Sequence, residues 1–272
     1  QVRKALAKAT DSGCNYYASS EGVPALRDAV AEKERKANSV PISGEDVIIT
    51  SGISEGIQFL TGALVQPGDE VLMPGPTYPP YSSFVKFFGG TPVAYRTVEE
   101  NDWLPDLEDL RRKITERTRA LVIVNPNNPT GSLYDEKTLK QMLDIAAENK
   151  LLVASDEIYD RLVYDSRFTS TAAVAKDVPV VGLNGFSKTY VMTGWRVGYL
   201  YFHDPANVLE ELKEAIAKES RIRLCASTPV QYAAVKALKG SQKHIAKMVR
   251  ILKERRDHFI RRIRSVKKLS CT

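Results

Sequence analysis

The chain has 272 residues, 43% of them hydrophobic and 26% charged, and a net charge of +6, a composition typical of a globular protein with one or two domains. No apolar run approaches the roughly 18 to 20 residues of a membrane-spanning helix, and the first residues lack the apolar centre of a secretory signal. The 3 cysteines and 3 histidines are too widely spaced to predict disulfides or a metal site, so we expect a cytoplasmic protein without metal or membrane partners.

Predicted strands and helices alternate along the first two thirds of the chain. A β-branched strand at 46–50 leads into a helix at 54–66 with apolar residues at helical spacing. Further strands are predicted at 70–74, 91–98, 119–126, 151–157, 178–185 and 197–202, with helices near 79–88, 105–115 and 135–150. Strands this apolar, separated mostly by helices, predict a mostly parallel seven-stranded sheet covered on both faces, which is a three-layer α/β/α domain.

After Phe202 the sequence predicts helices at about 206–219, 228–239 and 241–265. The basic run at 253–268 belongs largely to the last helix, and such runs are usually solvated. Nucleic-acid binding would favour exposed aromatic side chains among the basic ones, or a recognisable motif, and the sequence has neither. We therefore expect no nucleic-acid partner, although a positive surface can attract small anionic substrates.

Polar residues collect just past the ends of the predicted strands. Because ligands of parallel sheets bind beyond the carboxyl ends of the strands, these residues are candidates for a binding site. They are Gly52, Ile53, Ser54, Tyr78, Asn125 to Asn128, Asp156, Tyr159, Lys188 and Arg196.

The turn Gly52-Ile53-Ser54 leads straight into a predicted helix. The first N–H groups and the positive dipole end of a helix bind anions, and the Ser54 hydroxyl would add a donor. The alternative is that Ser54 only caps the helix. Arg196 offers a planar fork that suits a phosphate dianion, so together these residues predict a phosphorylated ligand.

Asp156 ends an apolar stretch, where an unpaired carboxylate would be costly. It could form a salt bridge, for example to Arg161, or cap the residues that follow. The alternative partner is a pyridine nitrogen, which a carboxylate at about 4 Å would attract by on the order of 4 kcal/mol at an effective dielectric constant of about 20. A pyridine ring kept protonated in this way is the electron sink that pyridoxal phosphate (PLP) chemistry requires.

Lys188 alone could be a solvated surface charge. In the company of Asp156, its amine can instead condense with the aldehyde of PLP. Asn128 and Tyr159 could donate hydrogen bonds to the phenolate oxygen of the ring. Tyr78 could stack on the ring face or pack in the core.

Four motifs resemble those of the class I and II PLP-dependent aminotransferases, which have fold type I and belong to the aspartate aminotransferase superfamily. They are YYASSEGVPALRDAV, NPNNPTG, SDEIY and SKTYVMTGWRVG, in family order along the chain. The runs DEVLMPGPTYPPY and RIRLCASTPVQYAA look particularly like archaeal alanine aminotransferases. The resemblance covers essentially the whole chain.

The resemblance implies catalytic roles for three residues. Lys188 matches the lysine that forms a Schiff base with PLP, Asp156 the partner of the pyridine nitrogen, and Tyr78 the aromatic residue stacked on the ring. Asn128 and Tyr159 match the partners of the phenolate oxygen. The other cofactor-binding residues implied are Gly52, Ile53, Ser54 and Arg196 at the phosphate, Ser187 beside the lysine, and Tyr17.

Tyr17 matches a tyrosine that reaches the phosphate of a neighbouring subunit, which implies a homodimer. Many relatives have a serine three positions before the lysine, where this chain has Gly185, so one phosphate donor is missing. By analogy with related enzymes, we expect a cis bond between Asn128 and Pro129.

Family members begin earlier and continue beyond Thr272, into a small domain whose arginine binds the substrate carboxylate. We therefore expect 1–240 to be the PLP-binding large domain, with a remnant of the N-terminal segment. We expect 241–272 to be a long connecting helix and the start of a small domain that is largely missing. A chain truncated at both ends in this way could bind PLP and yet transfer amino groups poorly.

The predicted function is transfer of an amino group between an L-amino acid, alanine-like by resemblance, and a 2-oxo acid such as 2-oxoglutarate. Another PLP reaction, such as C–S lysis or ring closure, is the first alternative. A pseudoenzyme that only retains the cofactor is the second. The third is the effector domain of a PLP-dependent transcription regulator, for which residues 1–20 show no helix-turn-helix segment.

Overall fold

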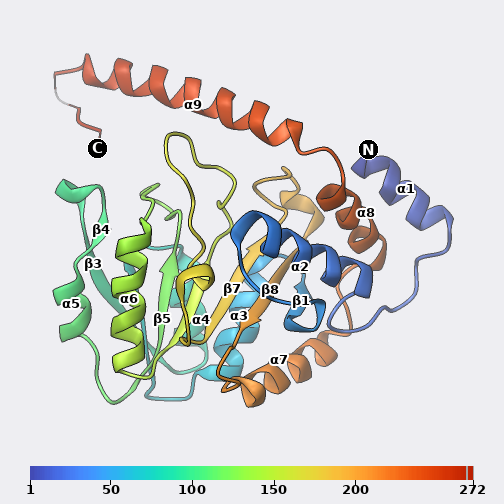
Figure 1. Ribbon diagram of the computed structural model, residues 1–272, viewed down its shortest axis with the longest axis horizontal. Coiled ribbons are helices and arrows are strands. Elements are labelled where there is room, and N and C mark those ends of the chain that lie inside the picture. The colour runs from blue at the N-terminus through green and yellow to red at the C-terminus, as the bar shows by residue number, and fades with distance from the viewer. Residues whose placement is uncertain (268, 272) are drawn as a thin grey trace.

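The computed structural model describes residues 1–267 and 269–271, and helices flank a central sheet (Figure 1). The strands are β1 (Val47–Thr50), β2 (Glu70–Gly75), β3 (Thr91–Val98), β4 (Leu104–Pro105), β5 (Thr118–Val124), β6 (Leu152–Asp156), β7 (Val180–Gly185) and β8 (Gly198–His203). The α-helices are α1 (Val2–Asp11), α2 (Pro24–Asn38), α3 (Ile53–Leu64), α4 (Pro79–Phe87), α5 (Leu107–Arg112), α6 (Glu136–Glu148), α7 (Glu210–Arg223), α8 (Thr228–Lys239) and α9 (Lys243–Arg264). Positions 268 and 272 of the segment predicted at 241–272 lie outside the described residues.

The sheet that the described residues form has 8 strands in the order β1-β8-β7-β6-β5-β2-β3-β4. Strands β7, β6, β5, β2 and β3 run parallel to one another, whereas β8 is antiparallel to both of its neighbours and β4 is antiparallel to β3. The mostly parallel α/β/α fold is thus confirmed, but the predicted count of seven strands is wrong. Strand β4 has only 2 residues, which is too short to leave a periodic pattern in the sequence.

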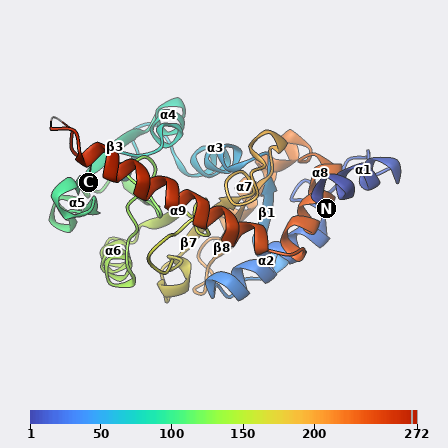
Figure 2. The same cartoon turned by 90° about the horizontal axis from the view of Figure 1, so that it is seen from above.

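Apolar layers cover both faces of the sheet. Figure 2 separates α3 and α4 on one side from α2 and α6 on the other. Leu26 of α2 and Leu143 of α6 are buried in one layer, and Ile57 of α3 and Val85 of α4 are buried in the other. Because the central strands are buried on both faces, their sequences read as nearly continuous apolar runs rather than as alternating ones.

Helices α1 and α2 precede β1, in a segment where the sequence analysis assigns no element. Helix α2 begins with Pro24 in its first turn and buries Leu26 and Val30, as an amphipathic helix does. It also buries Glu34 and Asn38 on the side that faces the sheet. These polar residues interrupt the apolar spacing by which the sequence would have revealed the helix.

Helix α9 has 22 residues and extends above the sheet (Figure 1). Two of its cations hold it to the loop after β6, because Lys253 and Arg256 both form ion pairs with Asp165. Among the helices of the described residues, none combines the length and apolar character needed to cross a membrane.

One edge of the sheet gathers residues from distant parts of the chain. Strands β1 and β7 are both antiparallel to β8, so their carboxyl ends and the amino end of β8 lie at the same edge. Gly198 at the start of β8 accordingly pairs with both Thr50 and Gly185. The carboxyl ends of β5 and β6 lie at this edge too, because both strands are parallel to β7.

Candidate active site

A cavity lies at this edge of the sheet. It is lined by Ile53, Ser54, Tyr78, Val124, Asn128, Asp156, Ile158, Tyr159, Ser187, Lys188, Thr193 and Arg196. Of the cofactor-binding residues predicted from the sequence, Gly52 and Tyr17 are outside this lining, as are the candidates 125–127. The fold therefore brings together side chains from six separate segments of the chain.

Gly52 and Arg196 form the end of the cavity at the start of α3. Gly52 is the N-cap of α3 and has φ 87° and ψ 163°, a backbone region that is essentially restricted to glycine. A Cβ atom on Gly52 would lie 2.3 Å from Nη2 of Arg196, so the guanidinium packs directly on this turn. The Arg196 guanidinium also donates from Nη1 to the carbonyl of Thr193 at 2.9 Å.

Ser54 is the second residue of α3 rather than its N-cap, so the alternative of a plain cap is wrong. Its hydroxyl and the first N–H groups of the helix lie at the same end of the cavity as the Arg196 guanidinium. Helix N–H groups, a hydroxyl and a guanidinium are the donors that a phosphate requires. This end of the cavity, which we call the Gly52–Arg196 cradle, can therefore accommodate an anion.

Asp156 is 2% exposed and ends β6 at the base of the cavity. Its Oδ1 accepts the N–H of Ile158 at 3.1 Å, and its Oδ2 accepts the hydroxyl of Tyr81 at 2.9 Å. Burial raises the pKa of Asp156 to about 6, against the opposing effects of these two donors and of the Lys188 charge. Within the described residues the carboxylate has no ion pair with Arg161, whereas its bond to Ile158 does cap the turn after β6.

Lys188 lies in the turn after β7, where it is half-buried. Its Nζ is 5.5 Å from the centre of the Tyr159 ring, so it is a cavity residue rather than a solvated surface charge. Tyr159 reaches the cavity from the loop after β6. A primary amine, a phenol and a buried carboxylate thus line one small space.

Asn128 enters the cavity from the loop after β5. The Asn128–Pro129 peptide bond is cis, as expected, and the Asn125–Pro126 bond is cis as well. The backbone N–H of Asn125 donates to the carbonyl of Asp156 at 2.9 Å, and its side-chain Oδ1 accepts the N–H of Tyr134 at 2.9 Å. The first bond holds the loop that carries Asn128 to the end of β6, and the second joins the two ends of that loop.

Three other predicted positions have distinct surroundings. Tyr78 is the N-cap residue of α4 and lines the cavity, and it also packs against the apolar layer of that face. A Cβ atom on Gly185 would lie 3.0 Å from Cα of Gly198, so β7 and β8 approach closely at the position where the family resemblance implies a serine. Tyr17 is 78% exposed and lies outside the cavity.

Sequence reasoning missed four residues of the site. Val124, Ile158 and Thr193 line the cavity, and Tyr81 supports Asp156 from behind. Ile158 and Thr193 lie inside two of the recognised motifs, which were the available signal. Tyr81 follows Tyr78 by three positions at the start of a helix, a spacing that places both side chains on one face.

The whole chain, residues 1–272, matches the model of the family "Aminotransferase class I and II". A probable aspartate aminotransferase of Methanocaldococcus jannaschii is 35% identical over 270 residues, which are 99% of this chain and 71% of the relative. The alanine aminotransferase of Mycobacterium bovis is 40% identical over 228 residues, which are 83% of this chain and 53% of the relative. The chain thus spans about half the length of this curated alanine aminotransferase.

Solved structures give the same result. The alanine aminotransferase from Pyrococcus furiosus is 50% identical and superposes with a TM-score of 0.98 over 100% of this chain and 69% of its own. An aminotransferase from Escherichia coli is 34% identical and has a TM-score of 0.95 over 99% of this chain and 67% of its own. By motif, sequence and fold, the chain belongs to the class I and II aminotransferases.

Proposed function

We propose that the protein transfers an amino group between an alanine-like L-amino acid and a 2-oxo acid such as 2-oxoglutarate, with PLP as its cofactor. The observation that carries this proposal is the convergence of Lys188, Asp156 and the Gly52–Arg196 cradle on one cavity. The alanine aminotransferases among the similar proteins support an alanine-like substrate.

The side chains present fit PLP. Because Gly52 has no Cβ atom, the Arg196 guanidinium lies against the start of α3, where both can donate to one anion. The buried carboxylate of Asp156 suits a cation, because a positive partner offsets the burial that raises its pKa to about 6. When bound, PLP supplies the electron sink for reactions at the α-carbon of an amino acid.

Each residue of the cavity then has a task. Asp156 would hold the positive charge of the ring nitrogen, and Arg196 with the start of α3 would bind the phosphate. Asn128 and Tyr159 would donate hydrogen bonds to the phenolate oxygen, and Tyr78 would cover one face of the ring. These contacts orient the Cα–H bond of the substrate and exclude water from it.

Lys188 would hold the cofactor aldehyde between turnovers. Once the substrate amine has displaced it, the Lys188 amine would accept the proton from the substrate Cα. It would then deliver this proton to a carbon atom of the cofactor. Its Nζ lies 5.5 Å from the centre of the Tyr159 ring inside the cavity, so the amine is placed beside the other residues that would hold the cofactor.

Substitution of Lys188 tests the cofactor part of the proposal. Lys188→Ala should abolish the visible absorbance of the chain with PLP and all amino transfer, whereas Lys137→Ala, an exposed lysine of α6, should leave both unchanged. Retention of the absorbance band by Lys188→Ala would refute the role of Lys188.

The reaction type is tested by product analysis. With L-alanine and 2-oxoglutarate, we expect equal amounts of pyruvate and glutamate. A single half-reaction, in which bound PLP takes the amino group from L-alanine, is the more sensitive assay for a chain shorter than its relatives. Absence of glutamate, together with release of a thiol, pyruvate and ammonia from a cysteine S-conjugate, would contradict amino transfer and indicate a C–S lyase.

A homodimer belongs to the same proposal. The high exposure of Tyr17, outside the cavity of its own chain, suits a side chain that reaches the phosphate of a partner. Sedimentation of the PLP-bound protein should give a dimer, and Tyr17→Phe should weaken PLP binding. A PLP-bound monomer of full affinity would contradict it. Cytoplasmic localisation and the division into 1–240 and 241–272 stay predictions.

A further inference from the structure

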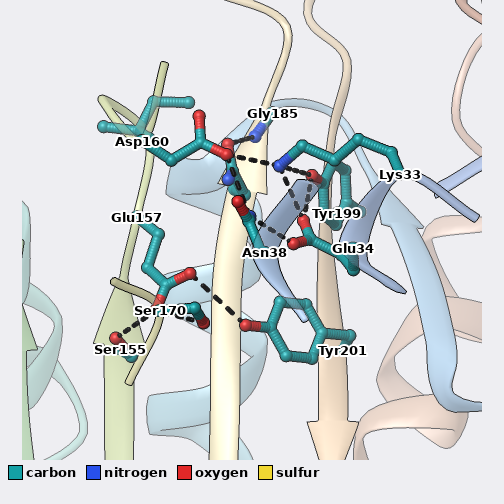
Figure 3. Close-up of polar contacts among 12 residues, drawn as sticks. Lys33, Glu34, Asn38, Ser155, Glu157, Asp160, Ser170, Gly185, Tyr199 and Tyr201 are labelled. Atoms are coloured by element: carbon teal, nitrogen blue, oxygen red, sulfur yellow. Dashed lines mark hydrogen bonds and ion pairs between the residues drawn. The ribbon is translucent and has the colours of Figure 1, made fainter. Parts of the chain in front are cut away.

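Behind the cavity, a cluster of polar side chains links the end of β6 to α2 and β8 (Figure 3). Figure 3 shows Lys33 and Glu34 facing Asp160 and Tyr199, and Glu157 facing Tyr201. This polar cluster consists of Lys33, Glu34, Asn38, Ser155, Glu157, Asp160, Ser170, Thr171, Tyr199 and Tyr201. It contains three buried carboxyl groups, and the segment between two of them, 157–160, includes the cavity residue Tyr159.

Lys33 is shared by two of the three carboxylates. Its Nζ lies 2.9 Å from Oε1 of Glu34 and 2.5 Å from Oδ2 of Asp160. Tyr199 and Asn38 donate further hydrogen bonds, at 2.6 Å each, to the two oxygens of Glu34. Burial lowers the pKa of Lys33, but the charges of Asp160 and Glu34 outweigh burial and raise it overall. One ammonium therefore balances two carboxylates only in part.

Glu157 is 0% exposed, and no described lysine or arginine forms an ion pair with it. Its Oε1 accepts the Ser170 hydroxyl and the Thr171 N–H at 2.9 Å each, and lies 3.1 Å from the Ser155 hydroxyl. Its Oε2 has a different environment, since its one recorded partner is the Tyr201 hydroxyl at 3.5 Å. A hydroxyl can accept a hydrogen bond as well as donate one.

These two environments match the two oxygens of a neutral carboxylic acid. One oxygen is surrounded by donors, as a carbonyl oxygen requires, and the other faces a group that can accept its proton. An anion at Glu157 would add a third negative charge to a buried cluster with one lysine, which is costly without a partner. Both hydrogen bonding and charge balance thus favour the neutral form.

The groups that face Glu157 come from each element around it. Glu34 comes from α2, Tyr201 from β8, and Asp160 from the loop after β6. Lys33 and Tyr199 act on Glu157 through Glu34, to which both are bonded. Burial is the first cause that raises the pKa of Glu157, and the charges of Glu34 and Asp160 raise it further, to about 8, against the Thr171 and Ser170 donors. Asp156 precedes Glu157 in the chain, with its carboxyl group in the cavity.

We propose that Glu157 carries a proton on Oε2 at neutral pH and, in this neutral form, is a positioning residue for the segment 156–160. The neutral carboxyl joins this segment to Tyr201 of β8 and to Ser170 and Thr171. Loss of the proton at alkaline pH leaves an unbalanced charge beneath Asp156 and Tyr159 and loosens both. This effect on cofactor binding rests on the proposed function, whereas the presence of the proton does not.

Glu157→Gln is the decisive variant because glutamine is a neutral group of the same shape. Its Oε1 keeps the three donors and its amide faces the Tyr201 hydroxyl, so the variant should fold. Infrared difference spectra of natural and 13C-glutamate-labelled protein at pH 7 should contain the carbonyl stretch of a protonated carboxyl, and Glu157→Gln should remove it. Glu219, whose pKa burial raises to about 7, can add to this band, so Glu219→Gln is the control.

Two pH series complete the test. The melting temperature of the wild type should fall between about pH 5 and pH 8, because folding raises the pKa of Glu157 from its usual 4.5 to about 8. Glu157→Gln should lose this part of the decline, whereas Glu116→Gln, a change at an exposed carboxyl, should keep it. The PLP dissociation constant of the wild type should rise above pH 8, by up to about tenfold per pH unit, and that of Glu157→Gln should rise less.

Three results would overturn the inference in whole or in part. Glu157 is ionised if Glu157→Gln removes no protonated-carboxyl band from the spectrum at pH 7. The same conclusion follows if the melting temperatures of the wild type and Glu157→Gln have equal pH slopes. Equal pH slopes of the PLP dissociation constant would refute positioning alone. Failure of every variant and the wild type to bind PLP would count against the proposed function, while the infrared result would still decide the proton.

Discussion

The hydrogen bond from Tyr81 to Asp156 should control how well the protein binds PLP. Tyr81 is 1% exposed, and its hydroxyl donates to Oδ2 of Asp156 at 2.9 Å. Tyr81→Phe keeps the ring and deletes this donor. A hydrogen bond to a charged group contributes about 1.5 to 3 kcal/mol. Its loss should therefore raise the pKa of Asp156, which is already about 6, by roughly one to two pH units.

A higher pKa means that Asp156 is largely protonated near pH 7 in the variant without PLP. Binding of a positively charged ring then requires that this proton leave, which costs part of the binding free energy. We expect PLP to bind about 10 to 100 times more weakly to Tyr81→Phe at pH 7, and the difference to shrink at higher pH. The assay is titration of PLP by visible absorbance between pH 6 and pH 9.

Tyr95→Phe is the matched control for this measurement. Tyr95 is equally buried and its hydroxyl also donates one hydrogen bond, but to the carbonyl of Val122 at 3.1 Å. It should lower stability without changing the pH dependence of PLP binding. Equal PLP affinities of wild type and Tyr81→Phe at every pH would refute the reasoning, and so would an equal effect of Tyr95→Phe.

Three further predictions concern stability and the phosphate end of the cavity. Gly52→Ala should weaken PLP binding strongly and cost about 1 to 3 kcal/mol of folding stability, measured by denaturant titration, because the backbone there is restricted to glycine and a Cβ would meet Arg196; unchanged affinity would contradict the cradle. Gly182→Ala should lower stability by about 1 to 3 kcal/mol, because its Cβ would lie 2.0 Å from the Tyr201 ring; a neutral result in the same titration would mean that the ring moves freely. Asp156 has a folded pKa of about 6, above its usual 3.8, so its contribution to stability is full below pH 4 and is lost as the pH rises through 6. Without PLP, Asp156→Asn should therefore be more stable than the wild type at pH 8, by up to about 3 kcal/mol, and should melt at a higher temperature. The two proteins should have equal stability near pH 4, and the variant should lose PLP binding. A variant less stable than the wild type at pH 8 would show that the buried carboxylate does not destabilise the fold.

The strands and the positions just after them could be predicted from the sequence because both follow from local patterns. Buried parallel strands are continuous apolar runs, and residues such as Asp156 and Lys188 stand out as polar groups that end them. The parallel arrangement then brings such ends to one edge of the sheet without further information. For this reason nearly all predicted site residues line one cavity.

Errors occurred where a residue's role depends on a distant partner. Strand β4 forms only because its 2 residues pair with the end of β3. Helix α2 can bury Glu34 and Asn38 because polar groups of other elements form hydrogen bonds with them. Neither case leaves a periodic signal. The alternative of Ser54 as a cap is wrong because α3 begins at Ile53 with Gly52 as its N-cap, so the helix starts one residue earlier than the sequence predicts.

The sequence by itself determined the order of strands and helices from β1 onward, except for β4, together with the family motifs and the chemical types of the cavity residues. The tertiary structure alone decided which buried groups share a proton or a charge. Tyr81 reaches Asp156 across 75 positions, and Lys33 reaches Asp160 across 127. The burial of a group and the charges around it depend on every neighbour in space. The pKa shifts of Asp156 and Glu157 can therefore be inferred only from the folded structure.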